Sequence, residues 1–227
     1  MVRGWEGHYE LVKLNLRNPA VAEYLFGCIR GWVEEFGVDG LRWMWLLSGR
    51  GFRAPSARLY RRPEAAFVLI GEMLHGDYKR MVNGAMLHSA TNYECYKGLY
   101  SSFNSMNLFE IGHSLARQFG PEAWTLYKGL PLLSFADNHD VTRVATILTN
   151  KEHLWPLYGV LFGMPGVPCV YYGSEWGMEG GKEDGDAALR PRGGHAAEKR
   201  ADGVYCPAGG GARGSRALCH GATARCC

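Results

Sequence analysis

The sequence has no apolar run approaching the roughly 18 to 20 residues that a membrane-spanning helix needs, and residues 1–6 lack the features of a signal peptide. Its net charge is small: the formal value is +3, and the arginines gather in irregular stretches, which argues against a nucleic-acid-binding surface. No Gly-rich phosphate loop follows an apolar run, which argues against a nucleotide-binding sheet. We therefore expect a cytoplasmic protein that binds neither membranes nor nucleic acids.

The seven cysteines lack the spacing of a disulfide framework or a zinc site. Four lie within residues 206–227, and no Cys-x-x-Cys pair has a matching second pair. The other three, Cys28, Cys95 and Cys169, lie singly in apolar or aromatic segments, where a free thiol behaves as a small hydrophobic group. We expect free cysteines and no metal site.

Helical and extended patterns alternate along the chain. Apolar residues at three- and four-residue spacing predict helices at residues 19–36, 107–119 and 154–162. Asn18 and Pro19 are a start signal for the first helix, and Gly37 is a stop signal. Short apolar runs predict strands at residues 38–45, 67–72, 130–136 and 167–172. The alternation predicts a parallel sheet with helices outside it, and without a phosphate loop a closed barrel is favoured over a doubly wound sheet.

Three of these strands include phrases that are typical of strand ends at an active site, and two of the three phrases end in a carboxylate. The phrases are Gly-Leu-Arg-Trp-Met-Trp at 40–45, Phe-Val-Leu-Ile-Gly-Glu at 67–72 and Phe-Ala-Asp-Asn-His-Asp at 135–140. The carboxyl ends of parallel strands in a barrel share one face, where active sites lie. Glu72 and Asp140 therefore become candidate catalytic carboxylates, whereas the phrase at 40–45 offers none.

At these residues the chain resembles the alpha-amylase family of glycoside hydrolases, in particular its neopullulanase, cyclomaltodextrinase and maltogenic-amylase branch. The matching phrases are Leu-Asn-Leu-Arg-Asn-Pro at 14–19, Gly-Leu-Arg at 40–42, Gly-Glu at 71–72, Asp-Asn-His-Asp at 137–140 and Val-Tyr-Tyr-Gly-Ser-Glu-Trp-Gly at 170–177. The resemblance implies an α/β fold, a partial (β/α)8 TIM barrel of about strands 4 to 8 within residues 1–192. It also implies that the first three strands and a carboxyl-terminal β-sandwich are missing.

The resemblance assigns roles to individual residues. Glu72 is expected to be the general acid/base, with a pKa raised by its surroundings, and Asp140 the transition-state stabiliser. Asn138 and His139 are expected to contact the sugar, and Arg42 to orient the nucleophilic carboxylate. In retaining glycosidases of this kind, two carboxyl groups stand about 5 to 5.5 Å apart, one attacking the anomeric carbon and one protonating the leaving oxygen.

Met44 stands at the nucleophile position, where the family carries an aspartate. A neutral thioether cannot attack the anomeric carbon, so the chain as written is expected to be inactive and Arg42 to lose its anionic partner. The codons CTG-GAT-GTG-GCT encode the family's Leu-Asp-Val-Ala; read one base late, they give Trp-Met-Trp-Leu, the sequence at 43–46. We therefore expect residues 43–66 to be out of frame.

Residues 193–227 consist mostly of Gly, Ala, Arg and Cys, without helical or strand periodicity. Such a composition buries too little apolar surface to offset the entropy lost on ordering. We expect a disordered tail, again out of frame, after the catalytic segment 1–192.

The implied substrate is an alpha-glucan oligosaccharide, with α-1,4 or α-1,6 linkages as in maltodextrin, pullulan or cyclodextrin. Two alternatives stay open: a catalytically dead glucan-binding or interaction module, and a glucan transferase of the same family. No cofactor is implied. Some relatives bind calcium, but the loops that carry its ligands fall largely outside this sequence, and the oligomeric state is left open.

The aromatic residues Tyr93, Tyr96, Tyr100 and Phe103 recur at helical spacing and are expected to be core residues. Sugar stacking is the alternative, because the segment lies between the predicted fifth and seventh barrel strands.

Overall fold

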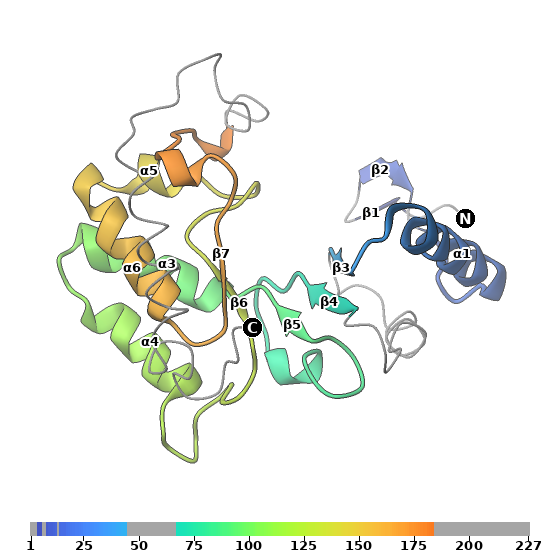
Figure 1. The fold of residues 1–227 in the computed structure, drawn as a ribbon, viewed down its shortest axis with the longest axis horizontal. Coiled ribbons are helices and arrows are strands. Elements are labelled where there is room, and N and C mark those ends of the chain that lie inside the picture. The colour runs from blue at the N-terminus through green and yellow to red at the C-terminus, as the bar shows by residue number, and fades with distance from the viewer. Residues whose placement is uncertain (1–3, 6–7, 13, 45–66, 184–227) are drawn as a thin grey trace. The chain divides into compact units, whose positions relative to one another are not determined.

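The computed structural model describes residues 4–5, 8–12, 14–44 and 67–183 (Figure 1). Of the regions expected to be out of frame or disordered, 43–66 and 193–227, only Trp43 and Met44 lie within these ranges. The chain divides into two units. Unit 1 comprises Met1–Glu72 and Met81–His88, and unit 2 comprises Met73–Arg80 and Ser89–Cys227.

Unit 1 contains an antiparallel pair of short strands, one long helix and two parallel strands. Its elements are β1 (Gly4–Trp5), β2 (His8–Val12), α1 (Pro19–Phe36), β3 (Gly40–Trp43) and β4 (Val68–Gly71). Helix α1 begins where the sequence predicted, since the Asn18 side chain accepts a hydrogen bond from the Ala20 N–H at 3.1 Å. It ends at Gly37, whose φ of 62° suits a residue without a β-carbon.

Strands β3 and β4 are paired in parallel, with Gly40 opposite Val68 and Trp43 opposite Gly71. On the other side of β4, His88 bonds to Leu69 twice: its backbone N–H donates to the Leu69 carbonyl at 2.9 Å, and its Nδ1 accepts from the Leu69 N–H at 3.0 Å. The end of β4, just before Glu72, is therefore fixed from both sides.

Unit 2 contains helices, one pair of parallel strands and the two-residue strand β5. The longer elements are α3 (Tyr93–Asn104), α4 (Phe109–Phe119), β6 (Leu133–Phe135), α6 (Leu154–Gly163) and β7 (Val167–Cys169). The shorter ones are η2 (Tyr78–Arg80), β5 (Ser89–Ala90), α5 (Val144–Ile147), η3 (Lys151–His153) and η4 (Ser174–Trp176). In β6 and β7, Leu133 lies opposite Val167 and Phe135 opposite Cys169.

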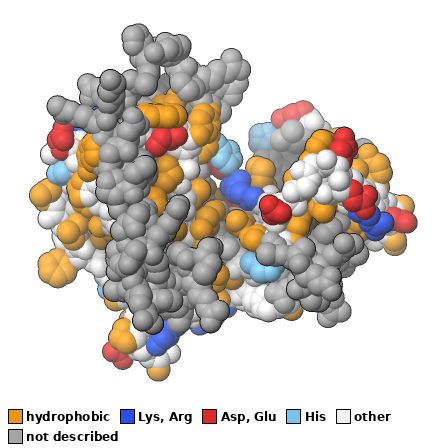
Figure 2. Space-filling model, viewed as in Figure 1, with side chains coloured by type: hydrophobic (Ala, Val, Ile, Leu, Met, Phe, Trp, Pro, Cys, Tyr) orange, Lys and Arg blue, Asp and Glu red, His pale blue; other side chains and the backbone are white. Residues whose placement is uncertain are grey.

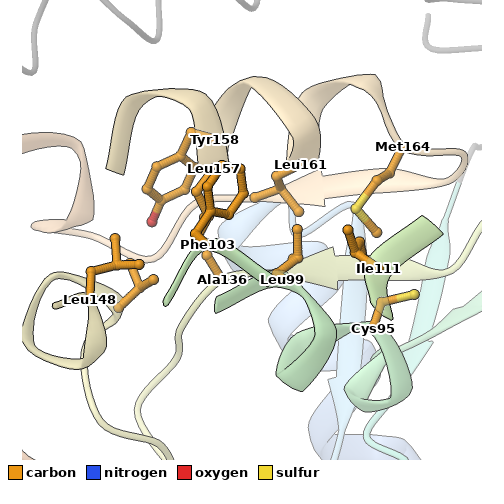
Figure 3. Close-up of a cluster of buried hydrophobic side chains, with 11 residues drawn as sticks. Cys95, Leu99, Phe103, Ile111, Ala136, Leu148, Leu157, Tyr158, Leu161 and Met164 are labelled. Atoms are coloured by element: carbon orange, nitrogen blue, oxygen red, sulfur yellow. The ribbon is translucent and has the colours of Figure 1, made fainter. Parts of the chain in front are cut away.

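The core of unit 2 lies where α3, α4 and α6 meet. Figure 3 shows Leu157 and Leu161 of α6 pointing toward Leu99 and Phe103 of α3, with Ile111 of α4 beside them. These side chains are at most 7% exposed. Burial of apolar area of this kind is the main favourable term in folding, so the cluster holds the helices together behind β6 and β7.

A polar cluster complements this core. The amides of Asn92 and Gln118 donate to each other, at 2.9 and 3.2 Å, and both side chains are fully buried. Asn92 also donates to the Ser134 hydroxyl at 3.3 Å. The cluster joins the start of α3, the end of α4 and strand β6.

Burial raises the pKa of the neighbouring Cys95 thiol to about 12, so the free cysteine is protonated and unreactive.

The periodicity predictions are confirmed for the helices, and the parallel pairing is confirmed for β3 with β4 and for β6 with β7. The strand lengths were wrong. The predicted strand at 167–172 ends at Cys169, and the run predicted at 130–136 forms a strand only over Leu133–Phe135. Cys28 and Cys95 are free cysteines, as expected.

Large apolar side chains remain exposed in both units, and orange atoms are scattered over the face drawn in Figure 2. On α1 these are Tyr24, Trp32 and Phe36; next to α4, Leu108 is 54% exposed, and Phe109 in the first turn is 88% exposed. Within the described ranges, no helix has the length and apolar content needed to cross a membrane.

Candidate active site

Glu72 lies immediately after β4 in unit 1. Its backbone N–H donates to the Trp43 carbonyl at 2.7 Å, which extends the β3–β4 ladder by one bond. Its side chain is only 4% exposed, and Oε1 lies 3.3 Å from Nη2 of Arg42 on the neighbouring strand. A buried carboxylate of this kind is costly unless a cation accompanies it, and Arg42 supplies that cation.

Met44 follows the last residue of β3 and is 61% exposed. The sequence led us to expect that Arg42 would lose its carboxylate partner once an aspartate was missing at position 44. That expectation was wrong, because Arg42 pairs with Glu72 instead. The physical reason is the parallel register. Arg42 lies opposite Ile70, and Glu72 follows two residues later, just after the end of β4, within reach of the guanidinium.

The other candidate residues belong to unit 2, in the loop that follows β6. Asp137 is 1% exposed; its Oδ1 accepts from the Ser174 hydroxyl at 2.7 Å and its Oδ2 from the Val144 N–H at 3.0 Å. Burial raises the pKa of Asp137, while these two hydrogen bonds and the charge of Arg143 oppose the rise. Both carboxylate oxygens are occupied within the protein, so Asp137 anchors the loop.

Asn138 also holds the loop in place. Its Oδ1 accepts from the Asp140 N–H at 2.8 Å, and its Nδ2 donates to the Tyr93 hydroxyl at 2.8 Å. The expectation that Asn138 contacts the sugar is not tested by these bonds. They do assign it a structural task, and they connect Tyr93 at the start of α3 to the loop.

His139 and Asp140 are the accessible members of the loop. Nε2 of His139 lies 3.2 Å from Oδ2 of Asp140, and their side chains are 36% and 44% exposed. The ring of His139 lies 6.3 Å from that of Tyr171. An imidazole beside a carboxylate offers both a donor and acceptors, which is what recognition of neighbouring hydroxyl groups requires.

Sequence reasoning missed the residues that support this loop from the segment after β7. Arg143 is 1% exposed; it donates to the Tyr172 carbonyl at 2.9 Å and to the Ser174 hydroxyl at 3.2 Å. A usable signal was present. Arg143 directly precedes the mostly apolar run at 144–148, and an arginine that is buried next to such a run requires a polar or charged partner. The predicted aromatic core residue Phe103 is buried, whereas Tyr93 and Tyr96 pack on Phe135 at the end of β6.

The structure thus brings Arg42 and Glu72 together in unit 1, and Asn138, His139 and Asp140 together in unit 2. Of the residues described, no three His, Cys, Asp or Glu side chains are grouped so as to hold a metal ion. Unit 1 holds a buried carboxylate beside a guanidinium, and unit 2, taken by itself, holds an accessible carboxylate beside an imidazole.

The family described as "Alpha amylase, catalytic domain" matches residues 53–203. Neopullulanase 2 of Thermoactinomyces vulgaris is 31% identical over 179 residues, covering 74% of this chain and 29% of the relative. The maltogenic alpha-amylase of Bacillus acidopullulyticus is 28% identical over 189 residues, covering 76% of this chain and 30% of the relative. The chain therefore spans about a third of the length of the curated relatives it matches.

Solved structures share the fold. A cyclomaltodextrinase superposes with a TM-score of 0.79 at 22% identity, covering 97% of this chain and 38% of its own. The cyclic α-maltosyl-(1→6)-maltose hydrolase from Arthrobacter globiformis, in complex with that sugar, gives a TM-score of 0.75 at 22% identity, covering 96% and 49%.

The first prediction concerns Asp137. A carboxyl group whose folded pKa is raised contributes stability that is full below its unfolded pKa, near 3.8, and is lost as the pH rises through the folded value. Replacing Asp137 with Asn removes this loss, so the variant should gain stability relative to the parent as the pH increases above 3.8. Urea unfolding at a series of pH values measures the difference. Asp39→Asn, at an exposed aspartate, is the matched control, and a difference that stays constant with pH would contradict the prediction.

The second prediction concerns the Arg42–Glu72 pair. Arg42→Met leaves a buried carboxylate without its cation and should lower the free energy of unfolding by about 1.5 to 3 kcal/mol. Lys151→Met is the control, since Lys151 and Glu179 form a pair at 2.9 Å whose side chains are 53% and 61% exposed. Exposed pairs contribute about 0 to 1 kcal/mol. Equal losses in the two variants, measured by denaturant unfolding, would mean that burial of Glu72 does not make its ion pair important.

Proposed function

This chain belongs to the alpha-amylase family, whose catalytic domain is a (β/α)8 barrel, and we propose that it represents about strands 4 to 8 of that barrel. The order of elements supports this extent. β3 contains the Gly-Leu-Arg phrase of the fourth barrel strand, and β4 leads into the Gly-Glu phrase of the fifth. β6 and β7 lead into the phrases at 137–140 and 170–177, which belong to the seventh and eighth strands. β5 then stands at the place of the sixth.

The proposed activity of the intact site is retaining hydrolysis of α-1,4 or α-1,6 bonds in alpha-glucan oligosaccharides. The observation that carries it is the buried carboxylate of Glu72 at the end of a parallel strand, next to Arg42. Glu72 is the general acid/base, giving a proton to the leaving oxygen and later taking one from water. Arg42 holds this carboxylate in place by a charge-assisted contact.

Asp140 is the proposed transition-state stabiliser. As the positive charge of the oxocarbenium ion develops, a carboxylate close to the sugar lowers the energy of that state. The partner of Asp140, His139, donates a hydrogen bond to a sugar hydroxyl. Both side chains are open to a ligand, in contrast to Asp137, which supports this division of roles within one loop.

The chain as written lacks the nucleophile. Met44 carries no charge and its sulfur cannot form the covalent glycosyl ester that retention requires. We infer that the exposed methionine results from a slipped reading frame over residues 43–66, with a second slip before the tail at 193–227. Only Trp43 and Met44 of these segments are among the described residues.

A second candidate is a glucan-binding module without catalysis, which Met44 favours. It requires the ligand-facing residues His139 and Asp140 but no nucleophile. The substrate class for both candidates draws on the names of the relatives, which refer to maltogenic activity, pullulan and cyclomaltodextrin. A cytoplasmic location is part of the proposal, supported by an intracellular maltogenic amylase of Bacillus subtilis among the relatives.

The third prediction tests the activity. Met44→Asp should raise the release of reducing sugar from maltodextrin or cyclodextrin at least about 100-fold over the parent, the lower end of the effect of one positioned catalytic group. Met44→Asn is the matched control, because asparagine has nearly the same shape as aspartate but carries no negative charge. If both variants hydrolyse equally well, a nucleophile at position 44 is not the missing element. Saturable binding of maltotriose by the parent, without hydrolysis, would instead support the binding module.

The fourth prediction tests the reading frame. Sequencing the gene across the codons for residues 40–70 and 188–200 should reveal Leu-Asp-Val-Ala in the neighbouring frame at 43–46. A missing or added base relative to intact relatives would confirm the slip. An uninterrupted frame on both sides, with no such phrase in any frame, would establish Met44 as the natural residue and leave only binding to be explained.

A further inference from the structure

Arg143 is a fully buried cation in unit 2, with 1% of its surface exposed. A buried charge is retained only where charges and dipoles compensate it. Its Nη1 donates to the Tyr172 carbonyl at 2.9 Å and to the Ser174 hydroxyl at 3.2 Å, and Cζ lies 4.2 Å from the centre of the Tyr171 ring. Every one of these partners belongs to the segment after β7.

The same residue is coupled to the loop after β6. Ser174, which accepts from Arg143, donates to the buried carboxylate of Asp137 at 2.7 Å, so a chain of hydrogen bonds connects the cation to the anion. Arg143 also attracts Asp137 electrostatically, against the repulsion from Glu175. In addition, the backbone N–H of Arg143 donates to the Gly180 carbonyl at 2.9 Å. The segments 137–144 and 171–180 are therefore joined by the side chain and the backbone N–H of Arg143 and by the bond between Ser174 and Asp137.

This junction determines where the two accessible residues of the loop lie. His139 is two residues from Asp137, and its ring lies 6.3 Å from that of Tyr171, the ring on which Arg143 is stacked. A guanidinium over an aromatic face is attracted by the ring quadrupole. The Tyr171 ring beside His139 is therefore held by Arg143 on its face, together with the Tyr172 ring, whose centre lies 4.8 Å away.

We propose that Arg143 is a positioning residue: it locks the Asp137–Ser174 junction and the Tyr171 ring so that His139 and Asp140 keep the geometry in which they meet a sugar. The identity of the ligand rests on the proposed function, whereas the locking does not. Lysine at this position would retain the charge but lose the planar group that donates to two acceptors and stacks on the ring.

The test compares the full chain with its Arg143→Gln and Arg143→Lys variants by NMR. Two signals report on the loop: the nuclear Overhauser contact between the His139 and Tyr171 rings, and the ¹⁵N shift of the His139 Nε2 atom beside Asp140. The signals are then followed during titration with maltotriose. We expect Arg143→Gln to lose the ring contact, to shift the Nε2 signal and to weaken maltotriose binding at least about tenfold. Arg143→Lys should fall between this variant and the parent.

Lys97→Gln is the matched control, because Lys97 is an exposed cation on α3 of the same unit. It should leave both NMR signals and the binding unchanged. If Arg143→Gln does not fold, Arg143→Lys decides, since it retains the charge opposite Asp137. A folded Arg143 variant with the ring contact and the Nε2 signal of the parent would overturn the proposal, and so would an equal loss in Lys97→Gln.

The two proposals fail in different ways. If the parent shows the ring contact but no saturable change with maltotriose, the proposed ligand is wrong, while the effect of Arg143 on the contact still decides its positioning role. If maltotriose binds the parent and Arg143→Gln equally well, and the ring contact is retained, the ligand stands and the positioning role is refuted.

Discussion

The free energy cost of burying a carboxylate constrains the candidate residues of each unit. Glu72 and Asp137 are each almost inaccessible to solvent, and each lies at or just after the end of a parallel strand. Each is compensated by an arginine, Arg42 or Arg143, one from a neighbouring strand and the other from the start of α5. Because a charge without such compensation would destabilise the fold, the positions of these arginines restrict where the strand ends and loops can lie.

The sequence predicted those parts of the fold that local pattern determines. The periodic apolar positions of α1, with Asn18 and Gly37 at its ends, predicted the helix to within a residue. Strand ends were harder, because residues 170–172 are as apolar and aromatic as the strand before them. Residues 170–172 are no longer paired with β6. There the Tyr172 carbonyl accepts a hydrogen bond from Arg143, and the Arg143 guanidinium stacks on the Tyr171 ring. That interaction comes from a residue almost thirty positions away, which periodicity cannot reveal.

The candidate site was predicted in part, and for a similar reason. The phrase at 137–140 contains two aspartates, and nothing in their local sequence distinguishes the anchor from the accessible residue. The distinction depends on Ser174 and Val144, which occupy both oxygens of Asp137 and leave Asp140 beside His139. Met44 illustrates the converse: β3 pairs with β4 through backbone groups alone, so a strand can form normally while its chemistry is lost.

The reciprocal amide pair of Asn92 and Gln118 limits which substitutions these two positions tolerate. Each amide is both donor and acceptor for the other, and neither reaches water. Replacing one of them with an apolar residue leaves the other without its partner, and replacing both also removes the Asn92 bonds to Ser134 and to the Cys95 N–H at the start of α3. These two positions, 26 residues apart, are therefore expected to change together among related sequences, because the junction between α3 and α4 depends on both of them.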